Sequence, residues 1–332
     1  MKAQENTQKP TIAIAGSSGR IGSRLKHYLS PHYNIISLQR TLSLSSHNES
    51  RDTILQLDIT DNKSVENAIN HLIRLQVRTI VNCIGDLNID GEEHTRGDKN
   101  STMYRVNVTG PKNLARVCRQ ENLKLVHLST EYIFDGRKPA GETYTELDEP
   151  NVSLESAPTW YGITKALGEK EVLAAYPDGS VVVRFCQIQS PLGGLFASTI
   201  KLLGMNQLFT RASNQMISPL TDATASEALL YIEKAVHEKN FRGIIHVSAS
   251  DAHSCFEISR MLANVYGLHK KAEKLITPTS LEELVASGEQ KAHRPHNPIL
   301  NMEKFNKLFG LKILGKTQKE IKRFHNLYPL IS

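Results

Sequence analysis

The stretch TIAIAGSSGRIG, residues 11–22, joins a short apolar run to three glycines spaced G-x-x-G-x-x-G. The apolar run predicts a buried strand, and the segment SRLKHYLS that follows has the spacing of a helix. Glycines at such a turn let main-chain amides approach a pyrophosphate at a helix N-terminus, whose dipole favours anions. The first spacing is one residue longer than in the common G-x-G-x-x-G motif. Dinucleotide binding is favoured here over a purely structural glycine turn.

Short apolar runs alternate with amphipathic segments as far as residue 185. Further strands are expected at residues 34–38, 53–57, 78–83, 124–128, 180–185 and 243–248. This alternation predicts an α/β fold with a doubly wound parallel sheet (Rossmann), covered by helices on both faces. We expect a dinucleotide-binding domain at residues 10–184 plus 223–249. A smaller, mostly helical C-terminal substrate domain, residues 185–222 plus 250–332, is expected as a cap over the carboxyl edge of the sheet.

Composition limits the kinds of partner. The net charge of +6 suits an anionic ligand such as a dinucleotide, or reflects a mixed, solvated surface. The lysines near the C-terminus alternate with acidic and apolar residues, unlike a nucleic-acid-binding stripe. No apolar run approaches the ~20 residues of a membrane span, and the first ten residues lack the apolar centre of a signal peptide. We therefore expect a cytoplasmic protein that binds neither nucleic acid nor membrane.

The four cysteines are too far apart in the sequence to suggest a metal site. They are Cys83, Cys118, Cys186 and Cys255. Without a metal-ligand spacing, they are expected to be reduced core residues, and no metal ligand is predicted.

The end of the second predicted strand bears on the choice of cofactor. An acidic side chain there would bind the 2′-hydroxyl of NAD, but residues 37–41 read SLQRT and contain no acid. Arg40 can pair with the 2′-phosphate of NADP through its planar guanidinium, and Arg20 can join it. The alternative is that both are ordinary surface arginines. Asp58 is placed either to touch the adenine or to cap the next helix. NADP(H) is therefore expected in preference to NAD(H).

Tyr161 and Lys165, in the stretch TWYGITKALGEK, lie one helical turn apart on the same face. A phenol has a pKa of ~10. A fixed ammonium beside it, together with the positive nicotinamide of the oxidised cofactor, would lower that pKa enough for proton exchange with a carbonyl or alcohol oxygen. The alternative is an aromatic side chain beside a solvated lysine. Ser129 and Thr130 end the fifth predicted strand, at the sheet edge where ligands bind. Together with the glycine loop, these hydroxyls favour the catalytic interpretation over local capping of the backbone.

Several stretches resemble, in order, an extended short-chain dehydrogenase/reductase, and within it the dTDP-4-dehydrorhamnose reductase-like group. They are GSSGRIG, YRVNVTGPKNLARVC, LSTEYIFDG, YTELDEPN, WYGITKALGEKEV, VVVRF, SPLTDATASEAL and HRPHNPILNMEKF. The resemblance implies NADPH-dependent reduction of the keto group of a nucleotide-activated deoxysugar. Such an enzyme is an NAD(P)-dependent oxidoreductase acting on CH–OH/C=O of a small nucleotide sugar. A homodimer is a possible assembly.

The resemblance also implies roles for individual residues. The catalytic trio would be Thr130, Tyr161 and Lys165. The cofactor would contact Gly16, Ser18, Gly19, Arg20, Ile21, Gly22, Arg40, Asp58, Ile59, Cys83, Ile84, Gly85, Asn107, Ser129, Tyr161 and Lys165. The substrate would contact Thr130, Glu131, Tyr132, Gln187 and Arg294, the last within the RPHNP stretch of the cap.

Some positions depart from the family pattern. Glu131 stands where the family usually has Asp, and the loop GDLNIDGEEHTRG lacks the usual alanines. Two other functions stay open: a sugar-nucleotide epimerase or dehydratase, and a non-catalytic cofactor-binding regulatory subunit like the partner of methionine adenosyltransferase. A dehydratase typically has two acids after the threonine. Here Tyr132 follows Glu131, which argues against dehydration but not against epimerisation. The intact trio argues weakly against the regulatory function.

Overall fold

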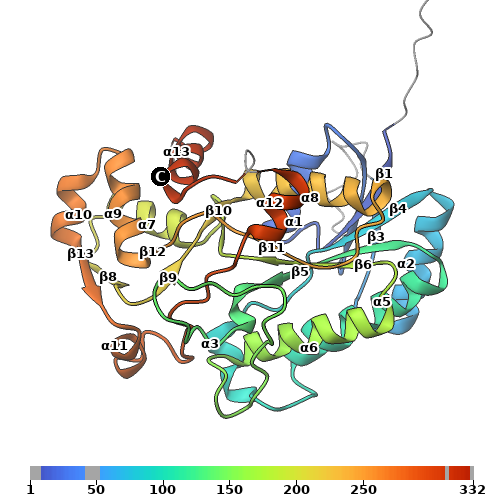
Figure 1. Cartoon of the computed structure of the whole chain (residues 1–332), viewed down its shortest axis with the longest axis horizontal. Coiled ribbons are helices and arrows are strands. Elements are labelled where there is room, and N and C mark those ends of the chain that lie inside the picture. The colour runs from blue at the N-terminus through green and yellow to red at the C-terminus, as the bar shows by residue number, and fades with distance from the viewer. Residues whose placement is uncertain (1–8, 42–52, 311–313, 330–332) are drawn as a thin grey trace, which may run out of the picture.

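The centre of the molecule is a seven-stranded sheet whose strands are all parallel, in the order β11-β6-β5-β4-β1-β2-β3 (Figure 1). The computed structural model describes residues 9–41, 53–310 and 314–329. The expectation that the N-terminus is not a signal peptide concerns mainly residues 1–8, which are not among them. The strands are β1 (Thr11–Ala15), β2 (Asn34–Gln39), β3 (Thr53–Gln56), β4 (Val77–Asn82), β5 (Lys124–Thr130), β6 (Ser180–Phe185) and β11 (Gly243–Val247). The order of the sheet reverses between β1 and β4, which is where such folds bind dinucleotides.

Helices cover both faces of this sheet. One face carries α1 (Arg20–Leu29), α8 (Asp222–Glu238) and α12 (Glu303–Phe309), and the other carries α2 (Asn62–Arg74), α5 (Gly110–Gln120) and α6 (Trp160–Ala175) (Figure 1). Each face has its own apolar core. The first core includes Ile14, Leu25, Leu229 and Phe305, and the second includes Ala13, Ile69, Leu114 and Val172. Because both faces are covered, β6 is buried at every position. The predicted doubly wound fold is confirmed.

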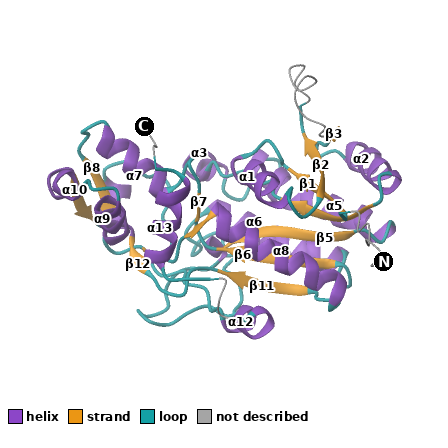
Figure 2. Ribbon diagram, turned by 90° about the horizontal axis from the view of Figure 1, so that it is seen from above, coloured by secondary structure: helices purple, strands orange, loops and turns teal. Residues whose placement is uncertain are grey.

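A smaller, mostly helical unit lies beside the carboxyl edge of the sheet (Figure 2). Its elements are β7 (Ile188–Gln189), α7 (Leu195–Gly204), β8 (Phe209–Ala212), β9 (Met216–Ile217), β10 (Leu220–Thr221), β12 (His253–Ser254), α9 (Cys255–Val265), α10 (His269–Leu275), β13 (Ile276–Thr279), α11 (Leu281–Ala286) and α13 (Thr317–Leu327). Phe196, Ile258 and Phe324 belong to a core of its own. One expected boundary differs, because α12 packs against β11 and places Phe305 in the core of the sheet domain.

The helical segment that spans residues 102–120 is interrupted. It consists of α4 (Thr102–Tyr104), a π-helical turn (Arg105–Thr109) and α5. Gly168 of α6 packs against this turn so closely that a Cβ would lie 2.1 Å from the carbonyl oxygen of Asn107. The remaining short helices are α3 (Ile89–Glu92) and two 3₁₀ turns, Glu93–Thr95 and Glu131–Ile133. π-Helical turns occur often beside functional sites.

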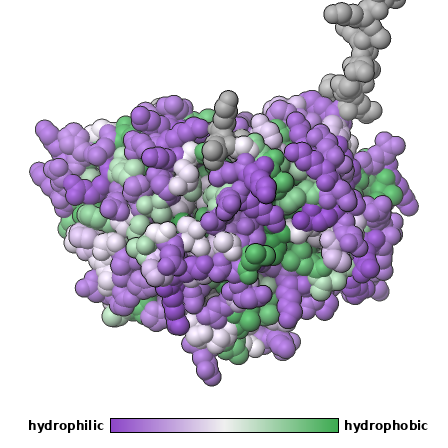
Figure 3. Space-filling view, viewed as in Figure 1, coloured by the Kyte–Doolittle hydropathy of each residue, from purple (hydrophilic) through white to green (hydrophobic). Residues whose placement is uncertain are grey.

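The described part of the chain contains no helix that is both long and apolar enough to span a membrane. The face drawn in Figure 3 is mostly hydrophilic, with its hydrophobic residues in small groups.

Candidate active site

The glycine loop folds tightly under the first turn of α1. Gly16 has a φ of +79°, a conformation that favours glycine. A Cβ on Gly22 would lie 2.1 Å from the carbonyl oxygen of Gly16, so this position also requires glycine. Gly19 is the N-cap of α1 and provides no capping side chain. No side chain of the described residues caps the first amides of the helix, which leaves them available to an anionic ligand.

A cavity of about 610 Å³ runs from this loop to the end of β3; we call it the adenosine cavity. It is lined by Gly16, Ser18, Gly19, Arg40, Asp58, Ile59, Cys83, Ile84, Gly85 and Arg105, among others. The pKa of the Asp58 carboxyl is lowered, chiefly by a hydrogen bond from Thr60 and more weakly by Arg40 and Arg105. Helix α2 is capped by Asp61, whose side chain accepts from Lys63 N and Ser64 N. Asp58, which the sequence offered as an alternative cap, instead lines the cavity.

Arg105 was not predicted from the sequence. It lies in the π-helical turn, and an ordinary helical pattern does not place it at the cavity.

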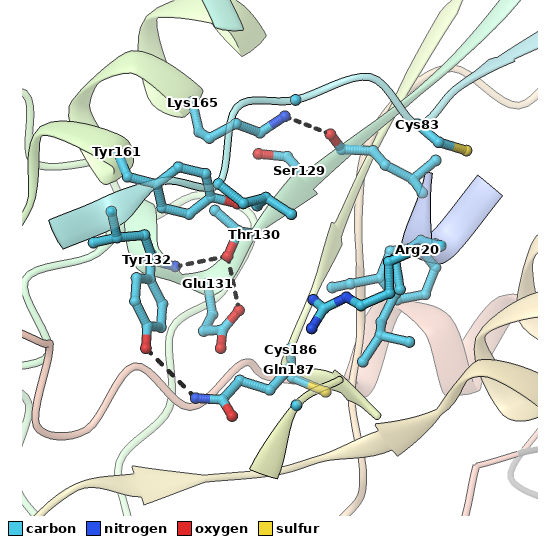
Figure 4. Close-up of a pocket in the computed structure, with 18 of the residues that line it drawn as sticks. Arg20, Cys83, Ser129, Thr130, Glu131, Tyr132, Tyr161, Lys165, Cys186 and Gln187 are labelled. Atoms are coloured by element: carbon cyan, nitrogen blue, oxygen red, sulfur yellow. Dashed lines mark hydrogen bonds between the residues drawn. The ribbon is translucent and has the colours of Figure 1, made fainter. Parts of the chain in front are cut away.

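A second cavity, of about 440 Å³, adjoins the first and shares Cys83, Ile84 and Gly85 with it. We call it the reactive cavity (Figure 4). It is lined by Arg20, Ile21, Ser129, Thr130, Glu131, Tyr132, Tyr161, Lys165, Cys186 and Gln187, among others. β5 ends at Thr130, and α6 begins next to Tyr161, where the Thr159 hydroxyl caps it by accepting a bond from Gly162 N at 2.8 Å. The predicted trio is thus brought together.

Lys165 is buried and donates a hydrogen bond from Nζ to the carbonyl oxygen of Leu128 at 2.7 Å. Burial lowers its pKa to about 8, while the carboxylate of Glu169, one turn further along α6, opposes this shift. Glu169 is itself paired with Arg184 of β6 at 2.7 Å. The ammonium of Lys165 is therefore mostly charged at neutral pH, and it loses its charge as the pH rises through about 8.

Lys165 is not among the main influences on the pKa of Tyr161 in this structure, so the expected lowering is not seen here. Burial is the main influence and raises the pKa of Tyr161 well above its ordinary value; the charge of Glu131 adds to this. A hydrogen bond with the Thr130 side chain and the charge of Arg20 lower it, but too weakly to compensate. The ammonium of Lys165 is instead held by the Leu128 carbonyl.

Arg20 also lies elsewhere than predicted. We expected it beside Arg40 at the 2′-phosphate, but it lines the reactive cavity and not the adenosine cavity. Figure 4 shows its guanidinium pointing into that space. Its Nε is buried and has no hydrogen-bond partner among the described residues. Arg20 lies in the reactive cavity because it begins α1 and sits next to Gly193 of the opposite loop. A Cβ on Gly193 would lie 3.2 Å from Arg20 Nη1.

Two other predicted cofactor residues lie behind the cavities. Gly22 supports the loop from below, and Asn107 is fully buried. The Asn107 side chain accepts from Asp86 N at 2.8 Å and donates to the Thr164 hydroxyl at 3.1 Å. It therefore joins the loop after β4 to α6 and does not face a ligand. Ser129 does line the reactive cavity, and its buried hydroxyl has no partner among the residues described.

A third cavity, of about 260 Å³, continues into the cap, and we call it the cap cavity. Tyr132 and Gln187 line both it and the reactive cavity. The predicted Arg294 lines the cap cavity, but its guanidinium is paired with Asp90 at 2.6 Å.

Arg211, which the sequence did not single out, lines the same cap cavity. Its Nη2 donates to the Ser198 and Thr199 hydroxyls at 3.0 and 3.2 Å. No carboxylate of the described residues pairs with it, and its Nε has no partner there. No sequence motif predicts this arginine, because its surroundings come from elements far apart in the chain.

Residues 10–328 match the model of a family described as RmlD substrate binding domain. The chain is 30% identical to dTDP-4-dehydrorhamnose reductase of Mycobacterium tuberculosis over 68% of its own length and 66%, just under two thirds, of that protein. It is 25% identical to methionine adenosyltransferase 2 subunit beta of Danio rerio, over 91% of this chain and 85% of that one.

Among solved structures, dTDP-4-dehydrorhamnose reductase of Bacillus anthracis in complex with NADP shares the fold. The TM-score is 0.77 at 23% identity, and the comparison covers 96% of this chain and all of the other. The match over residues 10–328 spans nearly the whole chain, with its glycine loop and its reactive cavity. The chain belongs to the RmlD substrate binding domain family.

Proposed function

We propose that this protein reduces the keto group of a nucleotide-activated deoxysugar and takes the hydride from NADPH. The observation that carries the proposal is that Thr130, Tyr161 and Lys165 line one cavity, which adjoins the cavity of the glycine loop. The mycobacterial relative, named as a reductase of a dTDP-linked keto sugar, supports the same reaction.

The residues fit a nicotinamide dinucleotide. The glycine loop leaves helix amides free, and Arg40, Arg105 and Asp58 line the far end of the adenosine cavity. In the adjoining reactive cavity, the Ser129 hydroxyl and Arg20 Nε are buried donors without partners in the described parts of the chain. Such atoms carry a desolvation cost that a bound ligand can remove. Bound in this way, the cofactor supplies the hydride.

Each member of the trio has a distinct role in the proposed reaction. The Thr130 hydroxyl holds the carbonyl oxygen of the substrate, and Tyr161 gives it a proton as the hydride arrives at carbon. The charged Lys165 holds the ribose of the cofactor and, once it is released from the Leu128 carbonyl, favours the developing phenolate. Cofactor binding therefore has to move the Lys165 ammonium away from the Leu128 carbonyl, or share it.

The cap cavity supports a substrate that carries phosphate. Arg211 is a partly buried cation that bonds only to neutral groups among the described residues, and burial lowers its pKa, so an anion would stabilise it. A guanidinium binds phosphate well because its donors match two oxygens at once. This cavity meets the reactive cavity at Tyr132 and Gln187, as a nucleotide attached to a keto sugar requires.

The proposal is tested by following NADPH absorbance with a panel of nucleotide-linked 4-keto-6-deoxy sugars. We expect oxidation of NADPH with at least one of them. Tight NADPH binding without turnover on any sugar would instead favour the regulatory function that the name of the Danio rerio relative suggests. A change of sugar configuration without net NADPH consumption would indicate an epimerase.

Replacing Arg40 with alanine should weaken NADPH binding by about 10- to 100-fold, because charge-assisted hydrogen bonds contribute ~1.5–3 kcal/mol. NADH affinity should change little, since NADH lacks the 2′-phosphate. The two dissociation constants can be measured by quenching of protein fluorescence. Arg116→Ala, an exposed position on α5, is the matched control and should leave both unchanged. Equal losses for both cofactors would contradict a 2′-phosphate role for Arg40.

Replacing Arg211 with glutamine should raise KM for the nucleotide sugar by about tenfold or more, because the substrate phosphate loses a charged partner. NADPH affinity should be unchanged, since the cap cavity does not include the glycine loop. Steady-state kinetics and NADPH titration separate the two effects. Arg260→Gln, on the exposed side of α9, serves as the control. An unchanged KM would place the nucleotide elsewhere.

A further inference from the structure

Glu131 is a buried carboxyl group in the reactive cavity to which the proposed reaction assigns no chemistry. Its side chain is only 4% exposed and pairs with no cation among the described residues. A buried carboxylate without a positive partner is costly, so such a group either becomes protonated or serves a function that compensates for the cost. If Glu131 only contacted substrate, a neutral amide or hydroxyl would cost less in this position.

The hydroxyl of Thr130 connects Glu131 to Tyr161. Thr130 Oγ1 and Glu131 Oε2 lie 2.9 Å apart and are joined by a hydrogen bond (Figure 4). Tyr161 lines the same cavity, and the Thr130 side chain acts on the pKa of its phenol as a hydrogen-bonding neighbour. The same hydroxyl accepts a bond from Tyr132 N at 3.3 Å, which fixes its position. A threonine hydroxyl both donates and accepts, so it can pass a proton along this line.

We propose that Glu131 is the proton donor that restores Tyr161 after each turnover, through the hydroxyl of Thr130. The inference rests on the proposed function, because it assumes that Tyr161 protonates a substrate oxygen. It adds an acid to the trio of Thr130, Tyr161 and Lys165 and explains why an acid occupies this buried position.

The protons balance at every step. Tyr161 gives its phenolic proton to the carbonyl oxygen as the hydride reaches carbon, and a phenolate remains. The Thr130 hydroxyl gives its proton to that phenolate and takes one from the Glu131 carboxyl. Glu131 is left as a carboxylate and takes up a proton from water when the product leaves. The sum is one carbonyl, one hydride and one proton converted to one alcohol.

The groups that face Glu131 are consistent with a protonated carboxyl near neutral pH. They are Arg20 from α1, Tyr132 from its own segment, Tyr161 from α6, and Cys186 and Gln187 after β6. Arg20 forms no ion pair with it within 4.0 Å in the described structure. Burial raises the pKa of Glu131 to about 7, while hydrogen bonds from Thr130 and Gln187 hold it from rising further. Glu131 is therefore a proton donor below about pH 7 and loses this capacity as the pH rises.

The test compares the first turnover with later ones in Glu131→Gln, a variant of the same size that carries no exchangeable acid proton. Rapid mixing of the NADPH-loaded enzyme with keto sugar should give a first hydride transfer within about twofold of wild type. The steady-state kcat should fall at least tenfold, because restoring Tyr161 becomes slow. Wild-type kcat should decline as the pH rises through about 7, and this decline should be absent in Glu131→Gln.

Two further variants complete the experiment. Glu131→Asp keeps an acid on a shorter arm and should recover part of kcat, and Glu155→Gln, on an exposed loop, should behave as wild type. If the rate of the first hydride transfer and the steady-state kcat fell equally in Glu131→Gln, the inference would be overturned, because Glu131 would then act in binding or positioning. Unchanged steady-state turnover would also overturn it. A wild-type protein that oxidises no NADPH with any sugar would overturn the proposed function itself, and the inference with it.

Discussion

Replacing Tyr161 with phenylalanine is expected to lower kcat by about 10²–10⁴-fold, the usual contribution of a general acid. The variant keeps the ring, which packs with Tyr132 in the apolar cluster around Trp160, so the fold should be preserved. It removes only the hydroxyl next to Thr130. NADPH affinity should change little, because the adenosine cavity does not include Tyr161. The measurements are steady-state NADPH oxidation and a binding titration on the same sample.

Tyr176→Phe is the matched control for this loss of one hydroxyl. Tyr176 follows the last turn of α6, and its hydroxyl donates to Asn122 at 3.3 Å, away from both ligand cavities. We expect this variant to keep full activity. If Tyr161→Phe retained activity within tenfold of wild type, the proton would have to come from another group, and the role given to Tyr161 would be wrong.

Replacing Gly22 with alanine is expected to damage the dinucleotide site even though Gly22 lines none of the three cavities described above. The new methyl group would lie 2.1 Å from the carbonyl oxygen of Gly16 and 3.0 Å from the Cα of Ser17. These contacts are with backbone, which cannot rotate away as a side chain can, so the loop or the start of α1 has to shift. Overpacking of this kind typically costs ~1–3 kcal/mol. NADPH affinity should fall at least tenfold, and the melting temperature should also fall.

Gly204→Ala provides the comparison, because Gly204 also lies in a helix, α7, and a Cβ there would meet nothing within 4 Å. Alanine favours helix over glycine by roughly 0.8–1 kcal/mol, so this variant should be as stable as wild type or more so. Thermal unfolding with and without NADPH measures both effects. A Gly22→Ala variant that binds NADPH as tightly as wild type would contradict the tight packing of the loop.

Local sequence patterns were sufficient for the sheet and for the reactive trio. The apolar runs and the glycines between the first strand and helix predict a parallel sheet with its ligand edge beside β1. The four-residue spacing of Tyr161 and Lys165 needs only a helix to bring them to one face. Thr130 ends its strand at the edge where the other strands also end. These features depend on near neighbours in the chain, so the sequence carries them directly.

Tertiary structure decided the electrostatics of the site, which the sequence alone did not determine. Arg20 reaches the reactive cavity instead of lying beside Arg40. Arg105 joins the adenosine cavity from a π-helical turn, and Arg211 lines the cap cavity. Burial raises the pKa of Tyr161, contrary to the prediction from its neighbouring lysine, and brings that of Glu131 to about 7. A pKa depends on how much water is excluded and on which charges lie nearby. Both are set by segments far apart in the sequence, so they are known only once the chain has folded.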